Sequence, residues 1–175
     1  MKSLKKILIN VASLSLLIIP MMGSAHLMVA ENGTLNFVDE NVYVVLSLPI
    51  SAFKGVDDDN DGHVSLKEFN EHRTEISANI MHNIYLSDVS NKFNIDGLLL
   101  NPTVSHENTT EIDELTIMGR YSLPTPDTKV SFSVKLFSGH KKLQHYDITA
   151  TNKKQALHNK FQLNPTTPTT IVFKK

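Results

Sequence analysis

The sequence contains no cysteine. Disulfide bonds therefore cannot stabilise this protein, a lipid anchor attached through cysteine is excluded, and stability has to come from a hydrophobic core, a bound ion or both. The chain also lacks G-x-S-x-G and H-E-x-x-H, the patterns of common serine and zinc hydrolases. Because no catalytic motif is present, we expect a protein that is not an enzyme, and an unrecognised hydrolase remains a third-ranked alternative.

Long apolar runs are confined to the start of the chain. Residues 7–20 are almost wholly apolar, follow three lysines and precede the small residues Gly23 and Ala25. This three-part arrangement predicts a signal peptide over residues 1–25. No later segment approaches the roughly 18 apolar residues that a membrane helix requires. We therefore expect an exported protein, periplasmic or secreted, with no transmembrane segment in the mature chain, which would begin at His26.

Charge is distributed unevenly along the mature chain. Residues 26–114 contain 16 acidic and 4 basic residues, whereas residues 115–175 contain 2 acidic and 10 basic residues. One interpretation is that both groups lie on solvated faces of a single fold and attract each other. The alternative is a positive face that meets an anionic membrane surface or an acidic partner. Nucleic acid is not expected as a partner, because basic residues are not interleaved with aromatic ones.

Apolar periodicity predicts a hairpin followed by a helix. Residues alternate in character on both sides of a turn near residue 40, with Leu35 and Phe37 before it and Val44 and Leu46 among those after it. Residues 50–55, just after Pro49, have room for one or two helical turns. Over residues 65–81 the apolar side chains recur at helical spacing, and we expect this helix to end near His82. Its apolar positions are Leu66, Phe69, Ile76 and Ile80.

The remainder of the chain consists of short runs rich in β-branched and aromatic residues, separated by turn-forming residues. Asp96-Gly97 has the composition of a two-residue hairpin turn. Strands at this spacing are typical of an antiparallel β-sandwich. We expect one mainly β domain over residues 26–175, with a helix-loop-helix inserted at about residues 50–82 after the second strand. The later strands are expected at residues 114–122, 129–137, 145–150, 158–163 and 169–173.

Acidic residues are concentrated in residues 56–69, which read VDDDNDGHVSLKEF. If Asp57 is position 1, carboxylates occupy positions 1, 3, 5 and 12 and glycine occupies position 6, which is the EF-hand calcium pattern. Alternate side chains of a curled loop can converge on one cation, and glycine permits the sharp turn. The expected ligands are Asp57, Asp59, Asp61, the carbonyl of His63, a water near Ser65, and both carboxylate oxygens of Glu68.

This ligand set supplies seven oxygens, a number that calcium accepts and magnesium does not, so Ca²⁺ is the expected ion. Val64 at position 8 is the usual apolar contact of such a loop, and Phe53 and Phe69 are placed to form a hydrophobic joint. Ser65 and Glu68 also have the spacing of a capping box at a helix start. We expect calcium to take the Glu68 carboxylate away from this capping role when it binds.

Only one such loop is present in the sequence. Asp88, Asp96 and Asp113 lack the required register. A single hand followed by a stiff helix favours a structural ion over a switch, with a dissociation constant of about 10⁻⁴ to 10⁻³ M. The expected function is a calcium-binding exported protein whose ion stabilises an accessory or partner-binding domain, with a membrane or envelope protein as its partner.

Histidine at the mature N-terminus suggests an alternative function in copper or nickel handling. The free amine and imidazole of His26 could chelate Cu(II) or Ni(II), with Met28 nearby and His140 or His145 completing the site. His72 falls on the apolar face of the expected helix, so we expect it to be packed in the core. His63 is expected to point out of the loop, because only its carbonyl is needed there.

The order of these features resembles that of a known family. Residues 44–73, VVLSLP followed by the acidic loop, and residues 130–150, which include LFSGH, are similar to the extracytoplasmic N-terminal domain of HupE/UreJ-type membrane proteins. The resemblance implies a connection with nickel or cobalt uptake. Because the chain has no membrane helices after this domain, the resemblance predicts a detached accessory domain and not a transporter.

Overall fold

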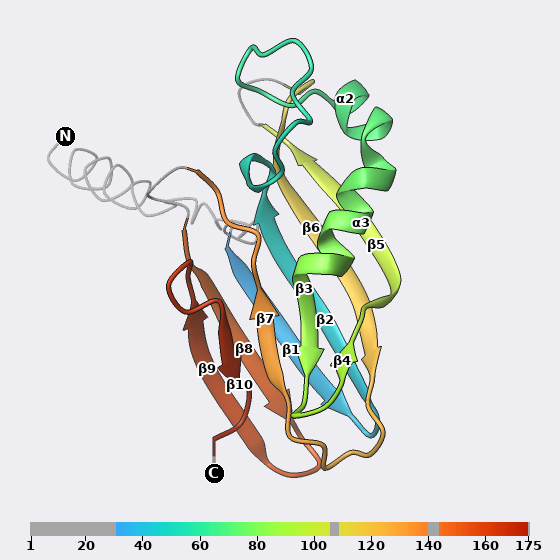
Figure 1. Ribbon diagram of the computed structural model, residues 1–175, viewed down its shortest axis with the longest axis vertical. Helices are drawn as coiled ribbons and strands as arrows, with labels where there is room; N and C mark the ends of the chain where they lie inside the picture. The colour runs from blue at the N-terminus through green and yellow to red at the C-terminus, as the bar shows by residue number, and fades with distance from the viewer. Residues whose placement is uncertain (1–30, 106–108, 140–143, 175) are drawn as a thin grey trace, which may run out of the picture.

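The computed structural model describes residues 31–105, 109–139 and 144–174, which form two sheets packed face to face (Figure 1). The expected signal peptide, His26, Met28 and His140 lie outside the described residues. Among the described residues, no helix has both the length and the apolar character needed to cross a membrane. The mainly β fold class is confirmed, with a small helical insertion between the second and third strands.

The larger sheet has six strands in the order β5-β6-β2-β1-β8-β9. The predicted hairpin is present, because β1 and β2 pair antiparallel with Phe37 opposite Val42. One pair departs from the expected all-antiparallel arrangement, since β1 and β8 are parallel. The strands are β1 (Asn32–Val38), β2 (Asn41–Pro49), β5 (Asp96–Val104), β6 (Ile112–Ser122), β8 (Tyr146–Asn152) and β9 (Leu157–Leu163).

The smaller sheet has four short strands in the order β10-β7-β3-β4. They are β3 (Ile84–Ser87), β4 (Lys92–Phe93), β7 (Ser131–Val134) and β10 (Thr169–Ile171). One hydrophobic core fills the space between the sheets, and its members come from every part of the described chain. Fully buried examples are Leu35, Leu46, Ile80, Leu86, Ile117, Tyr121, Phe132 and Tyr146.

The helical insertion differs from the expected helix-loop-helix in two ways. The segment before the loop forms only the 3-10 turn η1 (Ile50–Ala52), because the backbone is already extended at Phe53 (φ −100°, ψ 113°). After the loop, the expected single helix is divided into α2 (Leu66–Glu71) and α3 (Arg73–Asn83) by a non-helical conformation at His72. Phe69, Ile76 and Ile80 are buried as expected, whereas Leu66 is 43% exposed.

The prediction of a hairpin turn at Asp96-Gly97 was wrong. Strand β4 belongs to the smaller sheet, and the chain crosses between the sheets before β5 begins at Asp96. Gly97 has a left-handed backbone (φ +64°) and lies at a register shift in the pairing of β5 with β6. Gly97 therefore lies in a β-bulge. A bulge and a tight turn both favour glycine, so the local sequence does not distinguish them.

Candidate metal centre

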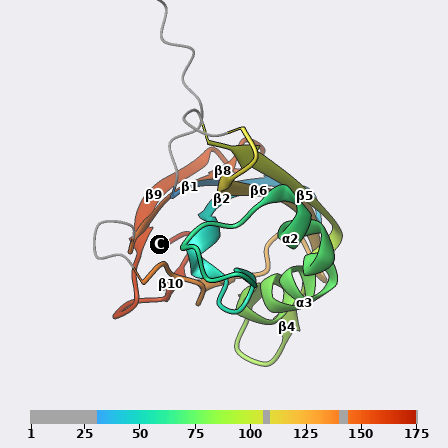
Figure 2. The same ribbon diagram turned by 90° about the horizontal axis from the view of Figure 1, so that it is seen from above.

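The acidic loop, residues 57–68, connects η1 to α2 and lies over one end of the sandwich (Figures 1 and 2). It follows β2 and approaches the start of β6, so both of its ends are fixed by strands of the larger sheet. Its position places the carboxylates at the surface, above the buried side chains of Val56, Val64 and Phe69.

The structure brings three of the predicted ligands together. Asp57, Asp59 and Asp61 each offer a carboxylate oxygen, and these oxygens all lie within 4.8 Å of one another. Backbone N–H groups of the same loop orient the carboxylates: Gly62 donates to Asp57 at 3.0 Å, and Asp61 donates to Asp59 at 3.2 Å. His63 donates in the same way to Asp61 at 2.8 Å. The three carboxylates could hold a metal ion.

One oxygen of this cluster is in an unusual environment. Oδ1 of Asp57 is inaccessible to solvent and has no hydrogen-bond partner among the described residues. A carboxylate oxygen removed from water without a partner is costly to stability. A cation bound at this oxygen would remove the cost, so the three carboxylates are a donor set that could hold a metal ion.

The backbone of the loop reverses direction as the motif requires. Gly62 has φ +90°, a conformation that side-chain-bearing residues rarely adopt. No atom lies within 4 Å of the position that a Cβ would occupy there, so the requirement is conformational and not steric. Asn60, at φ +58°, tolerates the left-handed region as asparagine often does.

The imidazole of His63 contacts the larger sheet. Its Nδ1 lies 2.9 Å from Oε2 of Glu111, a residue near the start of β6. Only the backbone of His63 is therefore oriented towards the interior of the loop, where its N–H bonds Asp61.

Glu68 does not join the carboxylate cluster and instead caps helix α2. One oxygen accepts from the N–H of Asp58 at 2.8 Å, and the other accepts from the N–H and hydroxyl of Ser65 at 2.8 and 2.7 Å. The Ser65 hydroxyl in turn accepts from the N–H of Glu68 at 3.2 Å, which completes the predicted capping box. These hydrogen bonds, that of the Ser65 hydroxyl above all, lower the pKa of Glu68 to about 2.

The exit of the loop is fixed to the larger sheet by a β-bridge between Ser65 and Glu111. The N–H of Ile112 donates to the carbonyl of Val64 at 2.8 Å, and the N–H of Leu66 donates to the carbonyl of Thr110 at 3.1 Å. The sequence carries no local signal for this contact, because the two segments are far apart along the chain. The start of β6 thus gives the exit of the loop a backbone partner.

A scan against protein-family models and a search of curated proteins found no match for this chain.

The expectation that His72 is packed in the core was wrong. Its Nε2 lies 2.9 Å from Oδ1 of Asp58 and its Nδ1 lies 3.4 Å from Oε2 of Glu75. These two carboxylates, Asp58 first, raise the pKa of His72. The contact gives Asp58 a function that the calcium pattern does not assign, since it ties the second residue of the loop to the junction of α2 and α3.

Of the histidines expected in the alternative copper or nickel site, only His145 is among the described residues. His145 lies between two carboxylates, 3.9 Å from Glu31 and 3.8 Å from Asp147, and contacts them through different ring nitrogens. This arrangement is that of an ion-paired surface histidine. The participation of His26 in a metal site stays a prediction, because His26 lies outside the described residues.

Proposed function

We propose that this protein binds one calcium ion in the loop from Asp57 to Glu68. Asp57, Asp59 and Asp61 supply the first three ligand oxygens, and the proposal depends above all on the convergence of their carboxylates. The buried Oδ1 of Asp57, which has no hydrogen-bond partner among the described residues, supports it. The carbonyl of His63, a water near Ser65 and the carboxylate of Glu68 complete the proposed shell.

The donor set favours a hard cation. Every proposed ligand is an oxygen, whereas zinc and copper sites in proteins are built mainly from nitrogen and sulfur. Calcium accepts seven oxygens in a flexible geometry, but magnesium requires a near-ideal octahedron and retains several waters. A loop with three side-chain carboxylates and one bidentate glutamate therefore selects calcium.

The capping role of Glu68 explains why the proposed affinity is low. To reach the ion, its carboxylate has to give up hydrogen bonds from Asp58 and Ser65 that stabilise its charged form. The free energy of those bonds is subtracted from the free energy of calcium binding. We therefore propose a dissociation constant for calcium of about 10⁻⁴ to 10⁻³ M, the range of extracellular modules.

The proposed role of the ion is structural. The loop is joined to β6 by backbone hydrogen bonds and to the core through Val64, and Phe69 of α2 continues this contact with the core. An ion that fixes the loop would stabilise this end of the sandwich and the helices that follow. We propose an exported accessory or partner-binding domain, in line with the resemblance to HupE/UreJ-type extracytoplasmic domains, with a membrane or envelope protein as its partner.

Calorimetric titration of the purified protein with CaCl₂ and with MgCl₂ tests the proposal, using Asp57→Asn and Asp58→Asn as a matched pair. The two substitutions remove the same charge from adjacent positions, but only Asp57 belongs to the carboxylate cluster. We expect one calcium per chain, little response to magnesium, and at least about a tenfold loss of affinity in Asp57→Asn. Asp58→Asn should stay within about threefold of the wild type. If both variants lost the same calcium affinity, binding would depend only on the overall negative charge of the loop and not on a specific site.

A further inference from the structure

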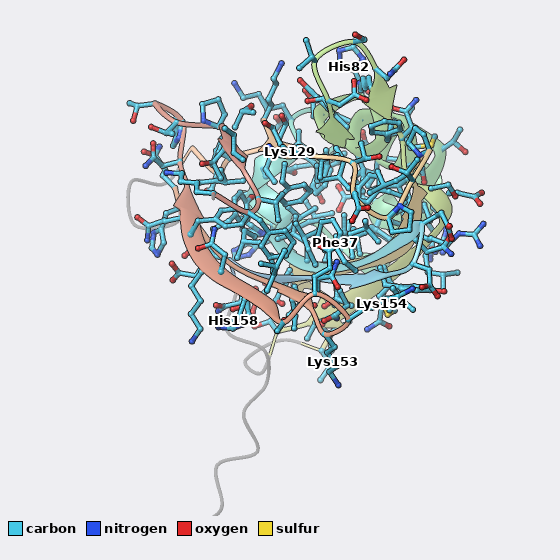
Figure 3. All side chains as sticks on the ribbon, turned by 90° about the horizontal axis from the view of Figure 1, so that it is seen from below. Phe37, His82, Lys129, Lys153, Lys154 and His158 are labelled. Carbon is cyan, nitrogen blue, oxygen red and sulfur yellow. The ribbon has the colours of Figure 1, made fainter. Side chains whose placement is uncertain are left out.

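A pocket of about 550 Å³ opens between the two sheets at the end of the sandwich opposite the acidic loop. It is formed by the end of β1, the turn from β8 to β9, the segment before β7 and the residues after β10. Figure 3 shows this end of the molecule, with Phe37 and Lys129 labelled. Its volume lies within the range of about 300 to 1,000 Å³ that small-molecule sites occupy.

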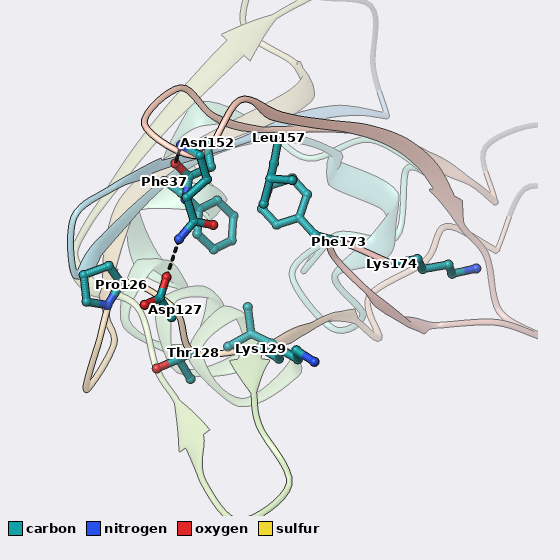
Figure 4. Close-up of a pocket in the computed structure, with 11 residues that line it drawn as sticks. Phe37, Pro126, Asp127, Thr128, Lys129, Asn152, Leu157, Phe173 and Lys174 are labelled. Atoms are coloured by element: carbon teal, nitrogen blue, oxygen red, sulfur yellow. Dashed lines mark hydrogen bonds between the residues drawn. The ribbon is translucent and has the colours of Figure 1, made fainter.

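The pocket exists because the smaller sheet does not cover the larger one completely. Strands β7 and β10 have 4 and 3 residues, whereas β1, β8 and β9 have 7 each. Beyond the ends of the short strands, the gap is crossed only by irregular segments. In Figure 4 the rings of Phe37 and Phe173 lie on one side of the pocket, and the segment from Pro126 to Lys129 lies on the other.

One wall of the pocket is apolar and aromatic. The rings of Phe37 and Phe173 meet edge to face with centroids 5.0 Å apart, which fixes both rings in place. Leu157 extends this wall and is 37% exposed, so part of its apolar surface is accessible from the pocket. The wall offers a preformed surface for the apolar part of a ligand.

The polar residues of the pocket favour an anion. The carboxylate of Asp127 accepts a hydrogen bond from Nε2 of Gln155 and keeps its negative charge, which the two lysines of the lining outweigh (Figure 4). Asn152 is buried and uses Oδ1 to accept from the N–H of Gln155 at 3.1 Å, which leaves its amide NH₂ to donate elsewhere. The side chains of Lys129 and Lys174 add two positive charges to the lining.

We propose that this pocket binds a small amphipathic carboxylate, with its apolar body against Phe37, Phe173 and Leu157 and its anionic group at the mouth near Lys129 and Asn152. A medium-length fatty acid or a carboxylate on an aromatic ring has this chemistry. The site goes beyond calcium binding and does not depend on it, because the two sites lie at opposite ends of the sandwich (Figure 1).

Decanoate and decanol form the ligand pair that tests the proposal, because they share a chain length and differ in charge. Binding is followed by displacement of the fluorescent anion 1-anilinonaphthalene-8-sulfonate from the folded protein. We expect one saturable probe site, displacement by decanoate, and displacement by decanol that is weaker by about tenfold. Near-UV circular dichroism recorded in parallel ensures that the probe reports a native pocket and not a loosened core.

Lys129→Gln and Lys160→Gln provide the matched protein variants. Lys160 is exposed on β9 and does not line this pocket. We expect Lys129→Gln to weaken decanoate binding by about five- to tenfold and to leave decanol unchanged, while Lys160→Gln behaves as the wild type. Leu157→Ser, at a partly exposed site, should weaken both ligands.

Three results would overturn the proposal: no saturable probe binding, equal binding of decanoate and decanol, or equal effects of the two lysine substitutions. Each titration is run with excess calcium and with EDTA. Binding that persists in both conditions would stand even if the calcium proposal fails, so the two failures are distinguishable.

Discussion

The ionisation of Glu68 is coupled to the fold through its hydrogen bonds. Its carboxylate accepts hydrogen bonds from the N–H groups of Asp58 and Ser65 and from the Ser65 hydroxyl, and its pKa falls from 4.5 to about 2. A carboxyl group whose pKa is lower in the folded state contributes stability above its unfolded pKa. That contribution disappears as pH falls from about 4.5 to about 2.

We therefore predict that Glu68→Gln destabilises the protein in EDTA at about pH 6 and that the difference from wild type shrinks towards about pH 3. Urea unfolding followed by circular dichroism measures the free energy of unfolding of each variant at each pH. Glu71→Gln is the control, because Glu71 lies on the same helix, is half exposed and makes only a 3.7 Å ion pair with Lys67. A constant difference between Glu68→Gln and wild type across this pH range would contradict the assigned hydrogen bonds.

The residues of the loop were predictable to different degrees. The register of Asp57, Asp59 and Asp61 could be read from the sequence, because their convergence depends on local spacing alone. The contact between His72 and Asp58 could not, since it depends on where helix α2 ends. Apolar periodicity placed His72 on the buried face of one continuous helix, and the interruption at His72 turned it towards the loop instead.

Helix α2 is short, and its first turn depends on the cap that Ser65 provides. The Ser65 hydroxyl accepts from the N–H of Glu68, and the Glu68 carboxylate accepts from the N–H of Ser65. We predict that Ser65→Ala lowers the free energy of unfolding in EDTA by about 1 kcal/mol, the usual cost of losing an N-cap side chain. Chemical denaturation at neutral pH is the measurement.

Ser77→Ala is the matched control for this substitution. Ser77 is on α3, where its hydroxyl donates to the carbonyl of Arg73 at 2.8 Å in the middle of a helix and caps nothing. Removing such a hydroxyl should change stability little. If the two alanine variants lose the same free energy, the capping box contributes nothing specific to α2.

At the level of elements, local patterns predicted most strands but not their partners. The alternating residues of β1 and β2 predicted the hairpin correctly, because its two strands are adjacent in the chain. The parallel pairing of β1 with β8 joins distant segments and has no local signature. Similarly, the helical turns expected before the loop are reduced to η1, since the backbone is already extended at Phe53.

Over the whole molecule, the acidic and basic halves of the sequence do not become separate halves of the structure. Strand β6 lies between β5 and β2, and β8 lies beside β1, so the two halves alternate within one sheet. Ion pairs cross between them, with Arg120 2.6 Å from Asp96 and Lys154 3.0 Å from Asp39. Mixed, solvated faces therefore account for the uneven charge more simply than a single positive face does.

The shared core also determines how calcium should affect stability. Val64 of the loop and Phe69 of α2 belong to the same core as both sheets, and the loop is bonded to β6, so it should unfold together with them. We predict one calorimetric transition whose midpoint rises with calcium. At ten times the dissociation constant the stabilisation is about 1.4 kcal/mol. For a domain of this size that corresponds to a shift of about 3 to 6 °C.

Differential scanning calorimetry in EDTA and in calcium measures this shift, with magnesium as the ionic-strength control. Asp57→Asn should abolish most of the shift because it removes a ligand from the cluster, while Asp58→Asn should preserve it. A separate low-temperature transition that alone responds to calcium would mean that the loop unfolds independently of the sandwich. In that case the ion would order only the loop, because a ligand stabilises only the cooperative unit whose unfolding releases it.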